Sequence, residues 1–208
     1  MVADRDLLVG GSLSGDISGD GTEDSAAVHV DDSAGAGCQA FVVVTAENGV
    51  SSAPVWVLGA TGGLSTPTLG SLAPIGREPG LEVIVNEAAG ASTQFVGAFS
   101  LTGEGLRRME VRGPSVSDVA GLFASGGSVG HLEAVDCLDD GVVVSAATPA
   151  AGRAALGRGI YNVVRRVFGV AGPVLEPEST HRNRVDIDDL NSRFPEFAHS
   201  PFLSCALL

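Results

Sequence analysis

Short apolar runs rich in valine recur along this chain, and glycine, proline, serine and aspartate stand between them. Valine and the aromatic residues favour β-strands, whereas the intervening residues favour turns. The pattern therefore predicts antiparallel strands joined by short connections. The clearest expected strands cover residues 39–46, 54–58, 95–101, 106–111, 131–138, 141–147 and 160–170.

The same order of strands and turns recurs in three stretches of the chain. They cover residues 12–60, 70–112 and 128–176, and a tail of residues 177–208 follows them. We therefore expect a single all-β domain of repeated antiparallel three- to four-stranded units, similar to propeller blades or arranged as a β-sandwich, with a short C-terminal helix. An ordinary closed propeller has about four to eight blades, so three such units would close only in part.

The helical pattern of this chain lies near its end. Residues 185–194 are expected to form a short helix, with Asp186 as its N-cap and Pro195 just after its last residue. The residues before it, 171–184, have the composition of extended, proline-bearing chain. The last residues, 197–208, are apolar, and we expect them to pack back on the sheet.

Three cysteines, Cys38, Cys137 and Cys205, lie far apart in the chain. Cys137 ends an expected strand and Cys205 lies in the apolar tail, so a disulfide between them would anchor the C-terminal residues. Such a bridge closes a long loop and would contribute about 4 kcal/mol to stability in the chain-entropy model. We predict this pairing, with Cys38 as the odd thiol; three reduced and buried cysteines are the alternative.

Oxygen-bearing side chains alternate in the loop before the first repeated strand. Relative positions one, three, five and nine are occupied by Asp16, Ser18, Asp20 and Asp24, and the backbone carbonyl of Thr22 falls at position seven. Calcium takes about six to eight oxygen ligands, and alternate residues of a tight loop can direct that many at one point. The loop therefore predicts a Ca²⁺ site; the alternative is an Asx-rich turn without an ion.

The residues after Asp24 separate this loop from an EF-hand, which has a glutamate at its twelfth position and continues into a helix. Here the twelfth residue is Ala27, and the stretch from Val28 to Val30 has the composition of a strand. The segment from Gly15 to Val30 resembles the calcium loops of FG-GAP and VCBS repeats, which occur in integrin-like β-propellers. The resemblance implies a propeller-blade-like unit that holds calcium through the five loop residues named above.

Two positions depart from this pattern. Ser18 stands where the FG-GAP and VCBS loops more often have asparagine or aspartate, which weakens one ligand. In the second repeat, Glu82 falls where Asp24 fell, but the earlier oxygen ligands are missing. We therefore expect the second loop to bind no ion.

Charge and composition narrow the range of partners. The chain has 25 acidic residues against 12 basic ones, all of them arginine, and a net charge of −13. Nucleic acid is an unsuitable partner for such a chain, because phosphate binding needs clustered positive charge. The absence of lysine beside abundant alanine, glycine and valine is typical of a bacterial protein from a high-GC genome.

Hydropathy and calcium together suggest a location. Apolar runs of about eighteen residues, which transmembrane helices need, do not occur. An export signal begins with basic residues and continues with an apolar stretch, and the sequence shows no such pattern. Because calcium is abundant outside cells, we expect a secreted or cell-surface protein whose signal is not part of this sequence.

The function expected from these features is a catalytically silent, calcium-binding β-repeat module with a structural or interaction role toward a protein or glycan partner. One alternative is a hydrolase, since Ser128 lies in a Gly-x-Ser-x-Gly motif and Asp186 and His199 follow in the order of a catalytic triad. A carbohydrate-active protein that uses its acidic side chains is another alternative. A purely structural domain with a vestigial loop is the third.

Overall fold

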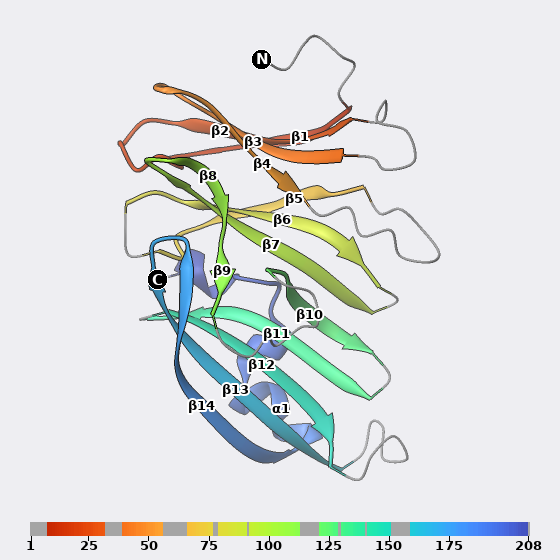
Figure 1. The fold of residues 1–208 in the computed structure, drawn as a ribbon. Helices are drawn as coiled ribbons and strands as arrows, with labels where there is room; N and C mark the ends of the chain where they lie inside the picture. Colours follow the sequence, from red (N-terminus) through yellow and green to blue (C-terminus); the bar gives the residue numbers. More distant parts are fainter. Residues whose placement is uncertain are drawn as a thin grey trace.

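The computed structural model of the 208-residue chain describes residues 8–31, 39–55, 66–76, 79–90, 92–112, 121–128, 130–139, 141–150 and 159–207. These residues form mainly β-strands in antiparallel sheets, with one short α-helix among them (Figure 1). The expected all-β fold class is therefore confirmed. Cys38 and the last three residues of the strand expected over 54–58 lie outside the described residues.

The first sheet is a four-stranded meander whose strands pair in chain order. Its strands are β1 (Leu8–Gly15), β2 (Asp24–Asp31), β3 (Gln39–Ala46) and β4 (Gly49–Val55). Alternate side chains of β2 and β3 are buried, as a sheet with one covered face requires. β4 begins at Gly49 rather than at residue 54 as expected, because Glu47 and Asn48 alone make the turn after β3.

The second sheet contains all remaining strands. They are β5 (Thr68–Ala73), β6 (Glu82–Ala89), β7 (Thr93–Thr102), β8 (Gly105–Arg108), β9 (Glu110–Val111), β10 (Phe123–Ser128), β11 (His131–Leu138), β12 (Gly141–Pro149), β13 (Ile160–Ala171) and β14 (Val174–Asp186). The order across this sheet is β5-β6-β7-β10-β11-β12-β13-β14-β9, and β8 pairs with the outer end of β7.

Strands β1–β4 and β5–β8 follow each other as two similar units. The first unit lies over the second (Figure 1), with β1 against β5 and β4 against β8. Apolar side chains from both units fill one shared core, to which Val28, Val42, Val83 and Phe99 belong. This burial of apolar area between two sheets holds the units together.

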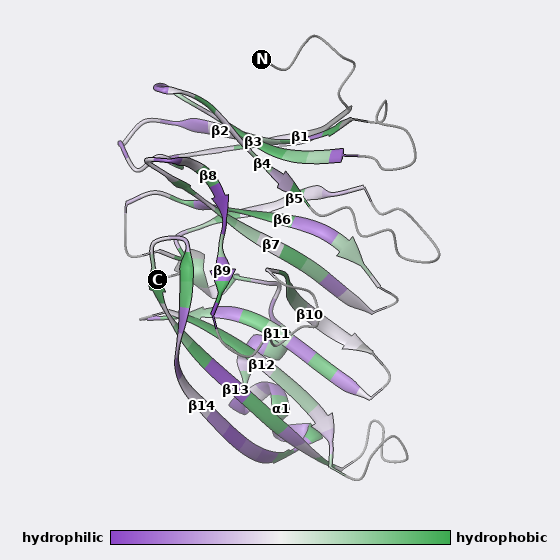
Figure 2. Cartoon of the chain, in the orientation of Figure 1, coloured by the Kyte–Doolittle hydropathy of each residue, from purple (hydrophilic) through white to green (hydrophobic). Residues whose placement is uncertain are grey.

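A second core lies between β5–β7 and β11–β13. Phe123, Val144 and Phe168 contribute to it, and Figure 2 shows the apolar stripes of these strands. A smaller core forms on the opposite face of β12–β14, where Tyr161 is buried together with Leu190 of the C-terminal helix. Tyr161 is therefore a core residue.

The structure corrects two expected elements. The strand expected over 106–111 divides at Met109, whose side chain is buried and whose amide donates to Ala98 O at 2.8 Å. β9 thereby leaves β7 and pairs in parallel with the start of β14. The segment 171–184, expected as extended proline-bearing chain, lies almost wholly in β14, a full partner of β13.

The C-terminal residues form short helices and return to the sheet. Helix α1 (Ile187–Arg193) is capped by Asp186, whose carboxylate accepts from the amide of Asp188 at 3.1 Å, as predicted. Two 3₁₀ turns follow, η3 (Pro195–Ala198) and η4 (Ser204–Leu207). None of the helices in the described part of the chain is long and apolar enough to cross a membrane.

The predicted packing of the tail on the sheet is confirmed. The tail lies along β11, where the amide of Phe202 donates to Val135 O at 3.2 Å and the ring of Phe202 meets Phe123 edge to face. A disulfide joins Cys137 of β11 to Cys205, so the predicted pairing is also confirmed.

Candidate metal centre

Four of the five predicted calcium ligands lie in the loop between β1 and β2, and the fifth, Asp24, is the first residue of β2. Ile17 is buried in the shared core and fixes the start of the loop. Gly19 and Gly21 have positive φ angles of 75° and 86°, which glycine adopts without strain. These features fold the loop back on itself before β2 begins at Asp24.

Asp16 and Asp24 hold the loop in this shape through one carboxylate oxygen each. Asp16 Oδ2 accepts from the amide of Gly21 at 3.0 Å, and Asp24 Oδ2 accepts from the amide of Ser18 at 2.6 Å. The other oxygen of each carboxylate, Oδ1, is buried and has no hydrogen-bond partner among the described residues, and the same holds for Ser18 Oγ. Buried oxygens without partners are costly, and a bound cation would satisfy all three.

Asp20 and Thr22 lie at the exposed tip of the loop. The amide and the hydroxyl of Thr22 donate to Asp20 Oδ1 at 2.8 and 2.5 Å, and these bonds lower the pKa of Asp20. Asp20 is therefore readily ionised, but its carboxylate is occupied by Thr22. Of the five predicted ligands, Ser18 is joined to Asp24 by a hydrogen bond and Thr22 to Asp20, whereas Asp16 is bonded to Gly21.

The donor set is one of hard oxygens. In the described part of the chain, three or more His, Cys, Asp or Glu side chains are nowhere gathered as a metal centre. The loop offers two buried carboxylate oxygens and a hydroxyl, so further ligands would have to include carbonyl groups or the surface carboxylate of Asp20. Such a mixed oxygen set suits calcium and lacks the nitrogen and sulfur ligands that zinc prefers.

In the corresponding loop of the second unit, a buried carboxyl group accepts hydrogen bonds from the backbone. Glu82, at the start of β6, accepts from the amides of Ile75 and Gly76 at 2.7 and 3.2 Å through Oε2. Its carboxyl group is buried, and this burial raises the pKa of Glu82. A carboxyl group thus binds two backbone amides of the second loop.

The two loops are in close contact, a feature that the sequence did not indicate. The amide of Leu81 donates to Asp16 O at 3.0 Å. A Cβ atom on Gly80 would lie 2.7 Å from Ile17 O, and one on Gly19 would collide with the carbonyl of Pro79. These glycines have no side chain at the place where the backbones meet, so the candidate ion loop is fitted against the second unit.

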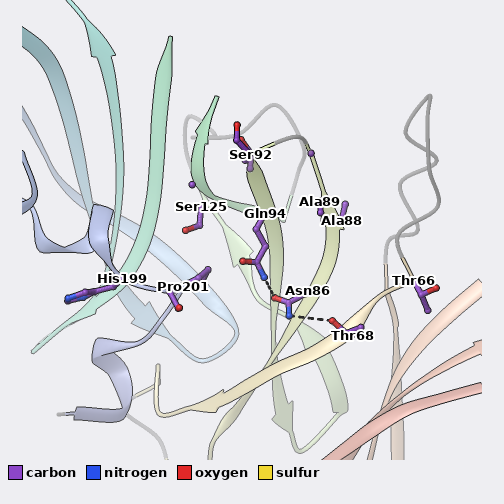
Figure 3. A pocket seen from close by; sticks show the side chains of 14 residues that line it. Thr66, Thr68, Asn86, Ala88, Ala89, Ser92, Gln94, Ser125, His199 and Pro201 are labelled. Carbon is purple, nitrogen blue, oxygen red and sulfur yellow. Dashed lines mark hydrogen bonds between the residues drawn. The ribbon is translucent and has the colours of Figure 1, made fainter. Parts of the chain in front are cut away.

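A polar pocket of about 580 Å³ lies between β5–β7, β10 and the tail (Figure 3). Gln94 donates to Asn86, which donates to Thr68 Oγ1 at 3.4 Å, so the amides in the pocket are largely occupied with each other. Ser125 and His199 also line the pocket, but Figure 3 shows the ring of His199 directed away from the amide pair.

The structure places the residues of the hydrolase alternative in a hairpin, a helix cap and a contact of the tail. Ser128 ends β10 and pairs with His131 of β11, so a hairpin stands where a nucleophile elbow would need a helix. His199 Nδ1 lies 3.0 Å from Asp136 Oδ2, whereas Asp186 caps α1. The Asp136 carboxylate also accepts from Ser204, which makes this a network that fastens the tail.

Comparisons of the chain with family models, with curated proteins and with solved structures gave no match in any of the three.

Proposed function

We propose that this protein is a calcium-binding β-repeat module, similar to FG-GAP and VCBS units, in which the ion has a structural role. The observation that supports the proposal is the group of three buried oxygens without hydrogen-bond partners, on Asp16, Ser18 and Asp24, within one loop. Asp24 is only 2% exposed, so water cannot readily replace a missing partner. A bound Ca²⁺ would supply the positive charge that these oxygens lack.

The contacts of the loop suggest what the ion does. Asp16 contributes a carboxylate to the candidate site and accepts the amide of Leu81 through its backbone carbonyl. A loop held rigid by an ion would therefore also hold the second unit in place. The proposed ion would stabilise the contact between the two β-units, and the protein would bind a partner through another surface.

Two features favour a secreted or cell-surface location. The Cys137–Cys205 disulfide is of a kind that persists in oxidising compartments. Extracellular modules bind calcium with dissociation constants of about 10⁻⁴–10⁻³ M, which suits the calcium levels outside cells.

Thermal melts with chelator and with about 1 mM calcium test the proposal. The linkage relation gives about 0.4–1.4 kcal/mol of added stability for dissociation constants in that range. Asp20→Ala should reduce the gain, because it removes a carboxylate ligand, while the bonds of Asp20 to Thr22 are exposed and cost little to lose. Magnesium should stabilise less, because it demands near-octahedral geometry.

The control variant is Glu23→Ala. Glu23 is an exposed carboxylate of the same loop outside the predicted ligand positions, so the calcium gain should persist in this variant. An unchanged wild-type melting midpoint, together with no heat of binding in calorimetry, would show that the loop is only a turn.

A further inference from the structure

The outer part of β14 has a free edge. β9 pairs with β14 only at Val174 and Leu175, so among the described residues β14 is hydrogen-bonded on one side alone from Glu176 to Asp186. Figure 1 shows this part of the strand at the margin of the sheet. A free edge presents backbone N–H and C=O groups to which another extended chain can pair.

This edge is basic in a strongly acidic protein. Residues 160–167 and 179–186 contain four arginines and a single carboxylate, Asp186, whereas the whole chain has a net charge of −13. Asp186 is already used as the cap of α1. Figure 2 shows the corresponding hydrophilic stretch along β14. The basic hairpin end is therefore a local reversal of the charge of the molecule.

Three of the arginines share one face of the hairpin. Arg182 of β14 lies opposite Val164 of β13, and Arg184 lies opposite Asn162. Arg166 of β13 follows Val164 by two residues. Residues opposite each other, and residues two apart, lie on the same face of a sheet. Arg182 and Arg184 are exposed, and Arg166 is partly buried.

The charges of these three arginines are not matched within the described part of the chain. The guanidinium groups of Arg166, Arg182 and Arg184 form no ion pair or hydrogen bond with another described residue. Arg165, on the other face, differs in this respect, because its Nε donates to the buried Glu196 at 3.0 Å. The three arginines are thus available to carboxylates from outside the chain.

We propose that the outer edge of β14 binds an extended acidic segment of a partner protein, which adds to the sheet as a further strand. The backbone of the segment pairs with the free edge, and its carboxylates face Arg182 and Arg184. Because these arginines are two residues apart, carboxylates at alternate positions of the segment match them. This surface does not depend on the calcium loop, which lies in the other sheet.

Two other occupants fit less well. A second copy of this chain, paired through the same edge in a two-fold antiparallel manner, would place arginines against arginines, which is destabilising. A polyanion such as polyphosphate would neutralise the arginines but would leave the backbone groups of the edge unpaired. The combination of free edge and alternate arginines therefore favours an acidic peptide.

Fluorescence anisotropy with a labelled peptide of about ten residues, alternating glutamate and threonine, tests the proposal. The wild-type protein should bind this peptide, and a lysine–threonine peptide should not bind. Arg182→Glu/Arg184→Glu should weaken binding by about tenfold or more, since two attractions become repulsions. Amide hydrogen exchange across residues 179–186 should slow when the acidic peptide is added, because strand addition protects edge amides.

The matched control is Arg107→Glu/Arg193→Glu, which makes the same charge change at exposed positions outside the basic face. Its affinity for the acidic peptide should stay within about twofold of the wild type, as rim charges contribute little. A glutamate–proline peptide, which lacks half of the N–H donors, should bind more weakly. Equal binding of that peptide, displacement by polyphosphate without any change in exchange, or no binding of the acidic peptide would each overturn the proposal.

Discussion

Asp24 and Glu82 begin equivalent strands of the two units and differ by a methylene group. Asp24 reaches one backbone amide, that of Ser18, and keeps an oxygen that is buried without a partner. The longer side chain of Glu82 reaches the amides of both Ile75 and Gly76. The same place in the fold therefore becomes a candidate ion site in one unit and a closed turn in the other.

Glu82 leads to a prediction about pH. Burial, the largest cause, raises its pKa above the ordinary value of 4.5, so the folded state binds this proton more tightly than the unfolded state does. Its contribution to the free energy of unfolding is therefore fully present below pH 4.5 and is lost as the pH rises through the folded pKa. Urea unfolding of the wild type and of Glu82→Gln, with chelator present, should show an advantage of the wild type that shrinks from pH 4.5 upward.

The control for this experiment is Glu104→Gln. Glu104 is exposed, at 73% of its side chain, and should show no such difference. A constant difference between wild type and Glu82→Gln across the pH range would contradict the prediction.

At the scale of elements, β11 is the strand on which the tail depends. Asp136 accepts from the amide and hydroxyl of Ser204 at 2.8 and 2.7 Å, and from His199. The neighbouring Cys137 forms the disulfide to Cys205. Two adjacent residues of β11 thus bind two adjacent residues of the tail, by hydrogen bonds and by a covalent bond.

We expect reduction of the disulfide to lower the free energy of unfolding by as much as about 4 kcal/mol, because the bridge closes a long loop in the unfolded chain. Urea unfolding with and without reductant measures the change. The double variant Cys137→Ala/Cys205→Ala should be less stable than the oxidised wild type by a similar amount and should not respond to reductant. Equal stability of the oxidised wild type and the double variant would show that the hydrogen bonds alone fasten the tail.

At the scale of the whole molecule, the candidate ion loop lies where two sheets meet. Its backbone touches the second unit through the Leu81–Asp16 hydrogen bond and through the close approach of Gly19 and Gly80 to neighbouring carbonyls. The proposed ion would therefore act on the association of the sheets as well as on its own loop.

Hydrogen exchange can show this coupling. Calcium should slow exchange in residues 79–82 as well as in 16–24, while β13 and β14 should not change. Gly80→Ala should lose stability by about 1–3 kcal/mol, since Gly80 has a φ of 121° and a Cβ would meet Ile17 O. In that variant, protection by calcium should remain in 16–24 and weaken in 79–82. If calcium slowed exchange only in residues 16–24 of the wild type, the ion site would be supported, but its role in joining the two units would be contradicted.

Several features could be read from the sequence because local chemistry decides them. Strands β3 and β11 have the expected bounds, since each is an apolar run between turn residues. Asp186 caps α1 through a bond to a residue only two positions away. The hydrogen bond between Ser18 and Asp24 likewise joins residues that are only six positions apart.

Other features were decided by the tertiary structure, because strand pairing joins residues that are distant in the chain. β14 is too polar to show the alternation of a half-buried strand, and its hydrogen bonds to β13 make it a strand. Met109 divides an apparent strand because its amide donates to Ala98 O and its side chain is buried in the core. The contact between Asp16 and Leu81 and the free edge beside Arg182 exist only once the sheets are assembled, so no pattern of neighbouring residues could have shown them.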